Sequence, residues 1–284
     1  MKRILSIFLS VICLFCFIFH TSCKKNKVAE DNIISFDSIQ VIETYHLFND
    51  EKKPNCNLSI NFVYPTKYSD EKKLDILQAI FIEKYFGKDY MNASPAEAVH
   101  EYKKNYLANY KDLENEYEEE LKLRELEHDD DASFFSYYEK SSSSIVFNKG
   151  NILSVRIDYS DYTGGAHGSS SKNCYVINLL TDKLLQESDI FYDDYNDKIT
   201  KIILDKITAT NEVKRPKDLE NIGFNVEDII PNGNFLADDK GITYIYNQYE
   251  IAPYVMGITT VFLPYEEISV FMKKDNPLAD LAGI

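Results

Sequence analysis

The first residues of this chain constrain its structure most, because their pattern is that of an export signal and not of a folded domain. Two basic residues precede an almost wholly apolar stretch, residues 4–19, and small polar residues then lead into Cys23. This order is typical of a bacterial lipoprotein signal, which is cut before the cysteine and leaves it carrying lipid. We therefore expect residues 1–22 to be a signal peptide, Cys23 to be the lipidation site, and the rest to work outside the cytoplasm.

Two alternatives to this signal remain open. His20 stands where lipoprotein signals usually have leucine, which leaves a plain signal peptide possible. An uncleaved anchor is the other alternative, although an apolar stretch of about 16 residues is short of the roughly 20 that cross a bilayer. Lys24 follows the cysteine in place of the aspartate that retains lipoproteins at an inner membrane. In a cell with two membranes, we expect the protein at the outer membrane or facing the periplasm.

Composition narrows the classes of partner. Apolar residues make up 44% of the chain and aromatic residues 13%, which excludes wholesale disorder. The formal net charge of −15 argues against nucleic acid and anionic lipid surfaces, which attract lysine and arginine clusters. A basic protein or a cationic ligand would be favoured. The alternative is that the acidic surface serves only solubility.

The part that follows a polar tether, residues 23–31, divides into two patterns. Residues 56–64 alternate apolar and polar side chains, as in a half-buried strand, and Pro65 is expected to end it. Helical spacing follows over 69–87, and again from Ser94 to about His128, where a serine cap, a proline and a glutamate open the second helix. Its tyrosine stripe is interpreted as a face packed on a sheet. We place an N-terminal domain at 32–132.

From residue 133 onward the pattern is mainly that of strands. Runs at 143–148 and 152–159 flank a Gly150-Asn151 hairpin connection, and further strands are expected at 175–180, 241–246 and 258–263. Apolar residues at helical spacing cover 195–207. We place a C-terminal domain at 133–275 and a tail at 276–284. The expected fold class is α/β of the α+β type: two adjacent small domains, each a mainly antiparallel sheet packed with one or two helices.

Cysteines and acidic residues give no metal site. Cys56 and Cys174, which lie outside the leader, could form one disulfide or remain buried free thiols. Neither has the nearby histidines of a zinc site. The run 128–131, His-Asp-Asp-Asp, lacks the spaced ligands and turning glycine of a calcium loop and is interpreted as a solvated charge run. We expect no metal and no cofactor.

The most distinctive local motif is Gly164-Gly165-Ala166-His167-Gly168. Its glycines permit positive φ angles and a close backbone approach, as a turn that grips a ligand requires. The lysine and hydroxyl of a phosphate loop are missing. Gly164, Gly165, His167 and Gly168 are therefore ligand-binding candidates, and the alternative is a tight turn that joins two strands with a capping histidine.

His167 could also act as a general base, because its side chain titrates near neutrality and Asp158 and Asp161 are close in the sequence. Such an arrangement would make the protein an envelope hydrolase acting on peptidoglycan or esters. Spacing alone does not establish it.

A second candidate is the tyrosine-rich segment after the strand 241–246, which supplies Tyr249, Glu250 and Tyr254 as ligand-binding candidates. Loops with rigid amphipathic rings are suited to contacting partners. They are equally suited to plugging the end of a sheet.

Four ordered blocks resemble one exported family. They are Gly164–Gly168, Val176–Leu179 through Ser188–Phe191, Gly241–Thr243 through Tyr249–Gly257, and Leu263–Ile268. The family is the domain of unknown function at the C-terminus of the anti-sigma factor RsiV and beside the deacetylase module of PdaC. Residues 33–128 are similar to the companion domain that often precedes it.

This resemblance implies an α/β fold without established catalytic residues. In the RsiV type the domain is a receptor that binds lysozyme. We expect this chain to depart from that pattern, with no sigma-binding segment before the leader and no deacetylase module after residue 284, so we expect neither signalling by that route nor deacetylation. The leading hypothesis is a non-enzymatic, lipid-anchored cell-envelope protein that binds a lysozyme-like protein or a glycan such as peptidoglycan. The alternatives are the hydrolase that uses His167 and a structural scaffold lipoprotein. The oligomeric state is left open.

Overall fold

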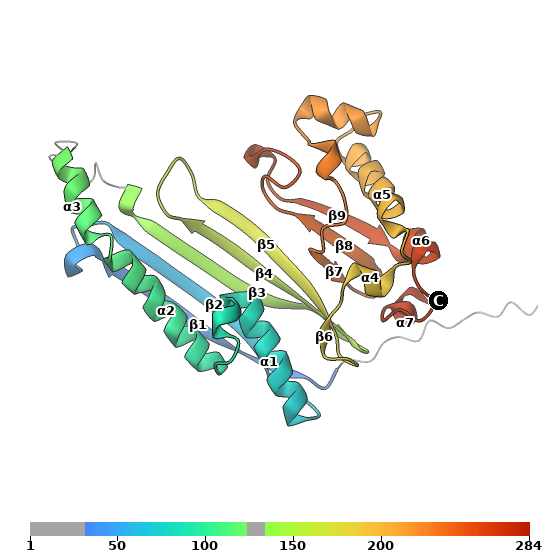
Figure 1. Ribbon diagram of the computed structural model, residues 1–284, viewed down its shortest axis with the longest axis horizontal. Coiled ribbons are helices and arrows are strands. Elements are labelled where there is room, and N and C mark those ends of the chain that lie inside the picture. The colour runs from blue at the N-terminus through green and yellow to red at the C-terminus, as the bar shows by residue number, and fades with distance from the viewer. Residues whose placement is uncertain (1–31, 124–133) are drawn as a thin grey trace, which may run out of the picture.

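The computed structural model describes residues 32–123 and 134–284 as two sheets with helices packed against them (Figure 1). The leader, Cys23, the tether and the charge run 128–131 lie outside the described residues. The larger sheet has the strand order β1-β2-β3-β4-β5-β6, and the smaller one the order β7-β8-β9. Among the strands of residues 32–123 and 134–284, only the β2–β3 pairing is parallel. The expected α+β class with mainly antiparallel sheets is confirmed.

Strands and helices follow one another in groups along the chain. The larger sheet is formed by β1 (Ser35–His46), β2 (Asn55–Lys67), β3 (Tyr137–Lys149), β4 (Ile152–Tyr162), β5 (Ser169–Asn178) and β6 (Lys183–Leu184). The smaller sheet is formed by β7 (Phe235–Ala237), β8 (Gly241–Tyr246) and β9 (Thr259–Pro264). The helices are α1 (Glu71–Phe86), α2 (Pro95–Lys111), α3 (Glu114–Leu123), α4 (Glu187–Ile190), α5 (Tyr195–Thr210), α6 (Tyr265–Ile268) and α7 (Ala279–Ala282).

The larger sheet continues across residue 132, where we expected a domain boundary. β2 precedes that position and β3 follows it, and the two pair in parallel from Cys56–Tyr137 to Asn61–Ser142. Parallel neighbours need a long crossover connection, and α1 to α3 supply it. Strands from both sides of the expected boundary therefore belong to one sheet.

Local sequence signals explain where the long helices begin. Asp70 caps α1 by accepting hydrogen bonds from the backbone nitrogens of Lys72 and Lys73, and Gly87 follows its end with a φ of 102°. Ser94 and Glu97 form the expected capping box of α2. The single helix that we expected to run to His128 is instead broken after Lys111. This break lets Tyr117 of α3 pack in a separate cluster with Leu47, Cys56, Tyr110 and Phe135.

Pro65 does not end β2, which continues to Lys67. At this end β2 pairs only with β1, because its pairing with β3 covers Cys56 to Asn61. A proline lacks a backbone N–H, and that absence breaks no ladder bond where one side of the strand is unpaired. The register of β1 and β2 shifts at Phe36, the partner of Pro65.

The larger sheet uses its two faces differently. Leu153, Val155 and Ile157 of β4 pack in a core beneath α1 and α2, which cover one face (Figure 1). On the other face, Ile152 and Val176 join the core built by α5 and the smaller sheet. Ser154 connects the two sheets, because its hydroxyl lies 2.5 Å from the Ala237 carbonyl oxygen and accepts from the Ala237 nitrogen at 3.2 Å.

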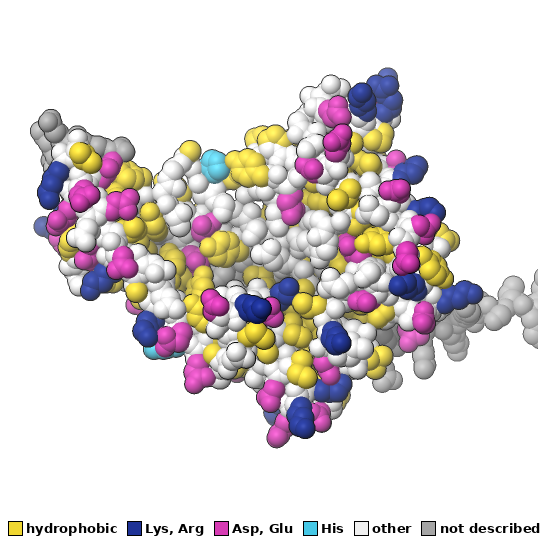
Figure 2. All heavy atoms as spheres, in the orientation of Figure 1, with side chains coloured by type: hydrophobic (Ala, Val, Ile, Leu, Met, Phe, Trp, Pro, Cys, Tyr) yellow, Lys and Arg dark blue, Asp and Glu magenta, His cyan; other side chains and the backbone are white. Residues whose placement is uncertain are grey.

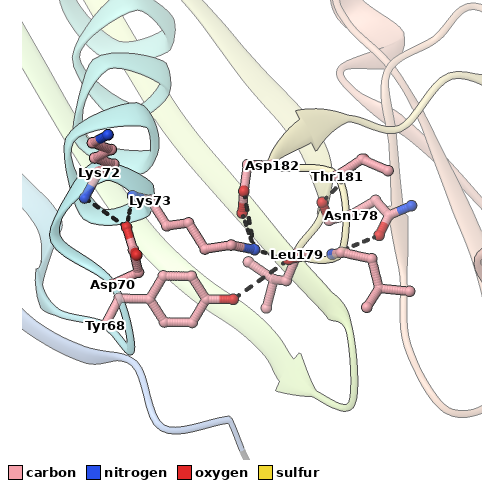
Figure 3. Close-up of polar contacts among 9 residues, drawn as sticks. Tyr68, Asp70, Lys72, Lys73, Asn178, Leu179, Thr181 and Asp182 are labelled. Carbon is pink, nitrogen blue, oxygen red and sulfur yellow. Dashed lines mark hydrogen bonds and ion pairs between the residues drawn. The ribbon is translucent and has the colours of Figure 1, made fainter.

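The start of α1 is tied to the turn between β5 and β6 (Figure 3). Lys73 Nζ lies 3.1 Å from an Asp182 carboxylate oxygen and donates to the Leu179 carbonyl at 3.3 Å. The Tyr68 hydroxyl reaches the same carbonyl at 3.5 Å. These contacts join segments more than a hundred residues apart and hold the helix layer against the sheet.

Cys56 and Cys174 are both buried free cysteines, on β2 and β5. Burial raises the pKa of Cys56 to about 11 and that of Cys174 to about 12. Thiolate is the reactive form of cysteine, so both side chains are inert at neutral pH and serve as small core residues.

Candidate functional site

The glycine-rich motif is the connection between β4 and β5, whose last paired residues are Asp161 and Ser169. Gly164 and Gly165 have φ angles of 89° and 98°, which side chains rarely tolerate. A Cβ on Gly168 would lie 2.6 Å from the Tyr138 hydroxyl and 2.7 Å from the Asp161 carbonyl oxygen. The turn therefore needs its glycines for its own shape.

This turn meets the tyrosine-rich segment between β8 and β9. The ring of His167 stacks on that of Tyr254, with centroids 4.0 Å apart and an angle of 26° between the planes. The Tyr249 hydroxyl lies 3.4 Å from His167 Nε2, and the rings of Tyr249 and Tyr254 are 5.8 Å apart. We call these three side chains the loop cluster. Residues about 80 positions apart in the sequence thus form one surface feature.

The loop cluster stands at the surface beside other apolar side chains. Tyr249 is 64% exposed and Val255 is 87% exposed, and His167 and Met256 are also exposed. Figure 2 shows hydrophobic side chains and a histidine gathered on the upper edge of this face, over the loops that end the two sheets. Exposed aromatic side chains that are already stacked lose little conformational entropy on contact with a partner.

Glu250 does not join the loop cluster. Its carboxylate accepts a hydrogen bond from the Asn247 backbone nitrogen and lies 3.5 Å from Asn232 Nδ2. Tyr249, just before it, has a φ of 67°. The carboxylate therefore braces the tight turn that presents Tyr249.

Three amide side chains hold the two loops in place, and sequence reasoning missed them. Asn234 Oδ1 accepts from the Cys174 backbone nitrogen at 2.7 Å, and Asn247 Oδ1 accepts from that of Lys172 at 2.7 Å. Gln248 Oε1 accepts from the Ser170 nitrogen at 3.0 Å. They bond alternate residues of β5, as a neighbouring strand would. Asparagine next to a strand is common, so its sequence pattern carried no distinct signal.

The acids considered for catalysis are engaged elsewhere. Asp158 pairs with Arg156 Nε at 2.8 Å, and Asp161 accepts from the Ser169 hydroxyl. His167 Nδ1 lies 2.9 Å from the Gly168 carbonyl oxygen, and its Nε2 faces Tyr249. Within residues 32–123 and 134–284, His167 has no hydrogen bond to a carboxylate. The hydrolase arrangement is not assembled in this structure.

A tyrosine-lined pocket also borders the β4–β5 loop, at Thr163, and sequence reasoning missed it as well. It has a volume of about 370 Å³ and lies between α2, the start of β3 and Thr163 of that loop. Hydrophobic side chains are visible in the hollow between α2–α3 and the sheet ends in Figure 2. Its rings come from Tyr90, Tyr102, Tyr106, Tyr110 and Tyr137, with Glu139 in the wall. The tyrosines of α2 recur every four residues, a spacing that core packing explains equally well.

The described residues contain neither a cluster of metal ligands nor a membrane-spanning helix. Across 32–123 and 134–284, no group of three or more histidine, cysteine, aspartate or glutamate side chains is arranged to hold a metal ion. Within those same ranges, no helix combines the length and apolar character that a membrane span requires.

A solved structure decides the family. A DUF3298 family member from Bacteroides fragilis NCTC 9343 is 38% identical to this chain, with a TM-score of 0.82, and the match covers 89% of this chain and 98% of that one. This chain belongs to the DUF3298 family. The model described as "Protein of unknown function (DUF3298)" matches residues 188–266, and the model described as "Deacetylase PdaC" matches residues 49–170. The resemblance found in the sequence blocks is thereby confirmed.

A more distant DUF3298 structure shares the fold. The family protein from Pseudomonas aeruginosa PAO1 is 16% identical, with a TM-score of 0.54, over 88% of this chain and 97% of that one. No curated protein is significantly similar to this DUF3298 chain. The PdaC match ends at residue 170, inside β5, and the DUF3298 match begins at residue 188, inside α4.

Proposed function

We propose that this protein is held to a bilayer outside the cytoplasm through Cys23 and binds an extracytoplasmic protein without catalysing a reaction. The observation that supports this most is the loop cluster, in which His167 and Tyr254 stack at 4.0 Å beside the exposed ring of Tyr249. Tyrosine anchors at a surface, surrounded by apolar residues, are typical of protein interfaces. The unassembled acid and histidine side chains make a binding role a better account than hydrolysis.

The charge of the chain favours a basic partner. A net charge of −15 would steer a cationic protein toward this surface and would slow the approach of an acidic one. Lysozyme is such a cationic protein, and it is the ligand that the RsiV-type resemblance suggests. We propose a lysozyme-like protein as the partner, with peptidoglycan as the alternative.

The test uses the chain from Lys24 onward, which contains every described residue. Calorimetry with lysozyme should show binding, and Tyr254→Ala should weaken it by about tenfold or more, as expected for an interface anchor. Ile42→Ala is a matched control, because Ile42 is 86% exposed on β1, away from the two loops. Equal affinities of the two variants would contradict the role of the loop cluster. Binding to neither lysozyme nor peptidoglycan fragments would contradict the proposal.

The anchor is tested separately. Mass spectrometry of the native protein should find a lipid-modified Cys23 as the first residue. An intact Met1, or an unmodified Cys23 thiol, would contradict anchoring and would leave the binding role to be decided by calorimetry.

A further inference from the structure

The tyrosine pocket holds a buried carboxylate that lacks a cation. Glu139 is 6% exposed, and its two oxygens accept from the Tyr102 hydroxyl at 2.7 Å and the Tyr159 hydroxyl at 3.3 Å. Burial raises the pKa of Glu139, although these two hydrogen bonds act in the opposite direction. No lysine or arginine among residues 32–123 and 134–284 forms an ion pair with it, and Asp161 adds a like charge.

A buried carboxylate without a cation is costly, because the charge loses its hydration and gains no opposite charge in return. Glutamate is almost never this buried unless it is paired. An oxygen pair also has more acceptor positions than the two hydroxyls fill. The pocket therefore offers both a charge to be neutralised and free lone pairs to be bonded.

The walls of the pocket suit a positive charge. Rings from α2, from β3 and from Tyr90 surround the space, and Tyr90 and Tyr102 pack edge to face with centroids 5.8 Å apart. The face of a tyrosine ring attracts an ammonium group, and a set of such rings is the usual device for binding organic cations. A volume of about 370 Å³ lies within the range of small-molecule sites.

A second polar group beside the same space has no partner. Tyr106 lines the pocket from α2, and its hydroxyl is buried and has no hydrogen-bond partner among the described residues. Asn105 is partly engaged, since its Nδ2 donates to the Tyr90 hydroxyl at 3.0 Å. The Tyr106 oxygen is free to accept a hydrogen bond from a ligand.

We propose that this pocket binds a small organic ammonium ion, with its N–H groups donated to the Glu139 carboxylate and the Tyr106 hydroxyl oxygen. The alkyl part of the ligand lies against the tyrosine rings and Leu113. This site is separate from the loop cluster and does not depend on the binding of a protein there.

Calorimetry with a charged and an uncharged probe tests whether the pocket prefers a positively charged ligand. At neutral pH and fixed ionic strength, n-pentylammonium should bind the chain from Lys24 onward at least about tenfold more tightly than 1-pentanol, which has the same alkyl chain and no charge. Equal binding would mean that the pocket is only apolar. No saturable binding of pentylammonium, 1,5-diaminopentane or ethanolamine up to about 10 mM would overturn the proposal. Displacement of the probe by equimolar potassium chloride would mean an inorganic cation site and would also overturn it.

Two variants assign the site. Glu139→Gln keeps the size of the side chain and its acceptor for Tyr102, and should weaken pentylammonium binding by about tenfold or more. Tyr106→Phe keeps the ring and should weaken pentylammonium binding, but not that of a trimethylpentylammonium ion, which has no N–H to donate. Glu43→Gln is the control, because it removes the same charge from a glutamate that pairs with Lys103 of α2 at 3.2 Å.

Outcomes for the two surfaces can be distinguished. If Glu139→Gln fails to fold, as judged by circular dichroism, Tyr106→Phe still tests whether the ammonium group contacts the Tyr106 hydroxyl. Unchanged affinity in Tyr106→Phe and in a folded Glu139→Gln would overturn the site assignment. Loss of ammonium binding with unchanged lysozyme binding would leave the proposed function intact, and the reverse result would leave the ammonium site intact.

Discussion

Two tyrosines one helical turn apart on α2 have opposite hydrogen-bond states. The hydroxyl of Tyr110 donates to the carbonyl oxygen of Phe135 at 2.7 Å inside the small core near α3, and both residues are buried. The hydroxyl of Tyr106 is buried beside the pocket and has no partner among the described residues. Both tyrosines belong to the same four-residue repeat on α2, so their spacing in the sequence does not distinguish them. Only the contacts made across the fold separate a structural hydroxyl from one that a ligand can use.

We therefore predict opposite effects for removing the two hydroxyl groups. Tyr110→Phe should lower the free energy of unfolding by about 1–2 kcal/mol, because it leaves the buried Phe135 carbonyl without its donor. Tyr106→Phe should change it by less than about 0.5 kcal/mol, since no bond is lost. Urea denaturation followed by circular dichroism measures both, and each variant serves as the control for the other. A larger loss in Tyr106→Phe than in Tyr110→Phe would contradict this account.

Among the elements, β5 is the one on which the candidate surface depends. Its final residues pair with β6, whereas its first half is bonded by the side chains of Asn234, Asn247 and Gln248 in place of another strand. These side chains belong to the segments before and after β8. The same bonds that protect the edge of β5 therefore also fix the position of the tyrosine-rich loop relative to His167.

Asn234 makes the most of these bonds, and its removal should be costly. Besides accepting from Cys174, its Nδ2 donates to the carbonyls of Lys172 and Ile245 at 2.9 and 3.0 Å. Asn234→Ala should lower the free energy of unfolding by about 3 kcal/mol, because the backbone groups of Cys174, Lys172 and Ile245 each lose a partner. Asn234→Asp keeps the acceptor for Cys174 but loses both donated bonds, so its free energy of unfolding should lie between that of Asn234→Ala and that of the unmodified chain. Thermal or urea unfolding gives the values.

The matched control for this prediction lies on the same strand. Asn173 is exposed, and its side chain makes no hydrogen bond within the described ranges. Asn173→Ala should be within about 0.5 kcal/mol of the unmodified chain. Equal losses for Asn234→Ala and Asn173→Ala would mean that the amide bonds to β5 contribute nothing to stability.

Elements were predicted from the sequence more reliably than their connections across the fold. The capping box of α2, the end of α1 at Gly87, the helix α5 and the hairpin at Gly150 follow from short-range rules, because caps and turns are made by residues close in the chain. The cap of α1 is Asp70, one residue after the Ser69 that we expected to open the helix. The continuation of β2 through Pro65 depends on which neighbour is absent, and the break after α2 depends on where Tyr117 can be buried. Neither is visible in a local window.

The candidate site likewise combines residues that the sequence indicated with contacts that it did not. The sequence indicated His167, Tyr249 and Tyr254 from the composition of two loops, but their contact depends on the pairing of distant strands. Glu139 gave no signal at all in a serine-rich strand. Its significance comes from its burial among tyrosines of another element, which only the folded chain displays.

At the scale of the whole molecule, the two sheets share one core. Phe147, Ile152 and Val176 of the larger sheet pack with residues of α5 and of the smaller sheet. The two family models therefore match parts of one chain whose sheets bury each other, although each sheet has its own topology. Cooperative unfolding is expected where apolar surface is shared in this way.

We predict that both sheets unfold together. The slowest-exchanging amides of β4 and β8 should show the same free energy of opening in hydrogen exchange, because neither sheet retains its core without the other. Ser154→Ala, which removes the hydroxyl bonded to the Ala237 backbone, should lower both values equally, by about 2 kcal/mol. Ser144→Ala should leave both unchanged, since the Ser144 hydroxyl has no partner among residues 32–123 and 134–284. A loss confined to β8 would instead establish two independent folding units, and the loop cluster would then bridge two bodies that can separate.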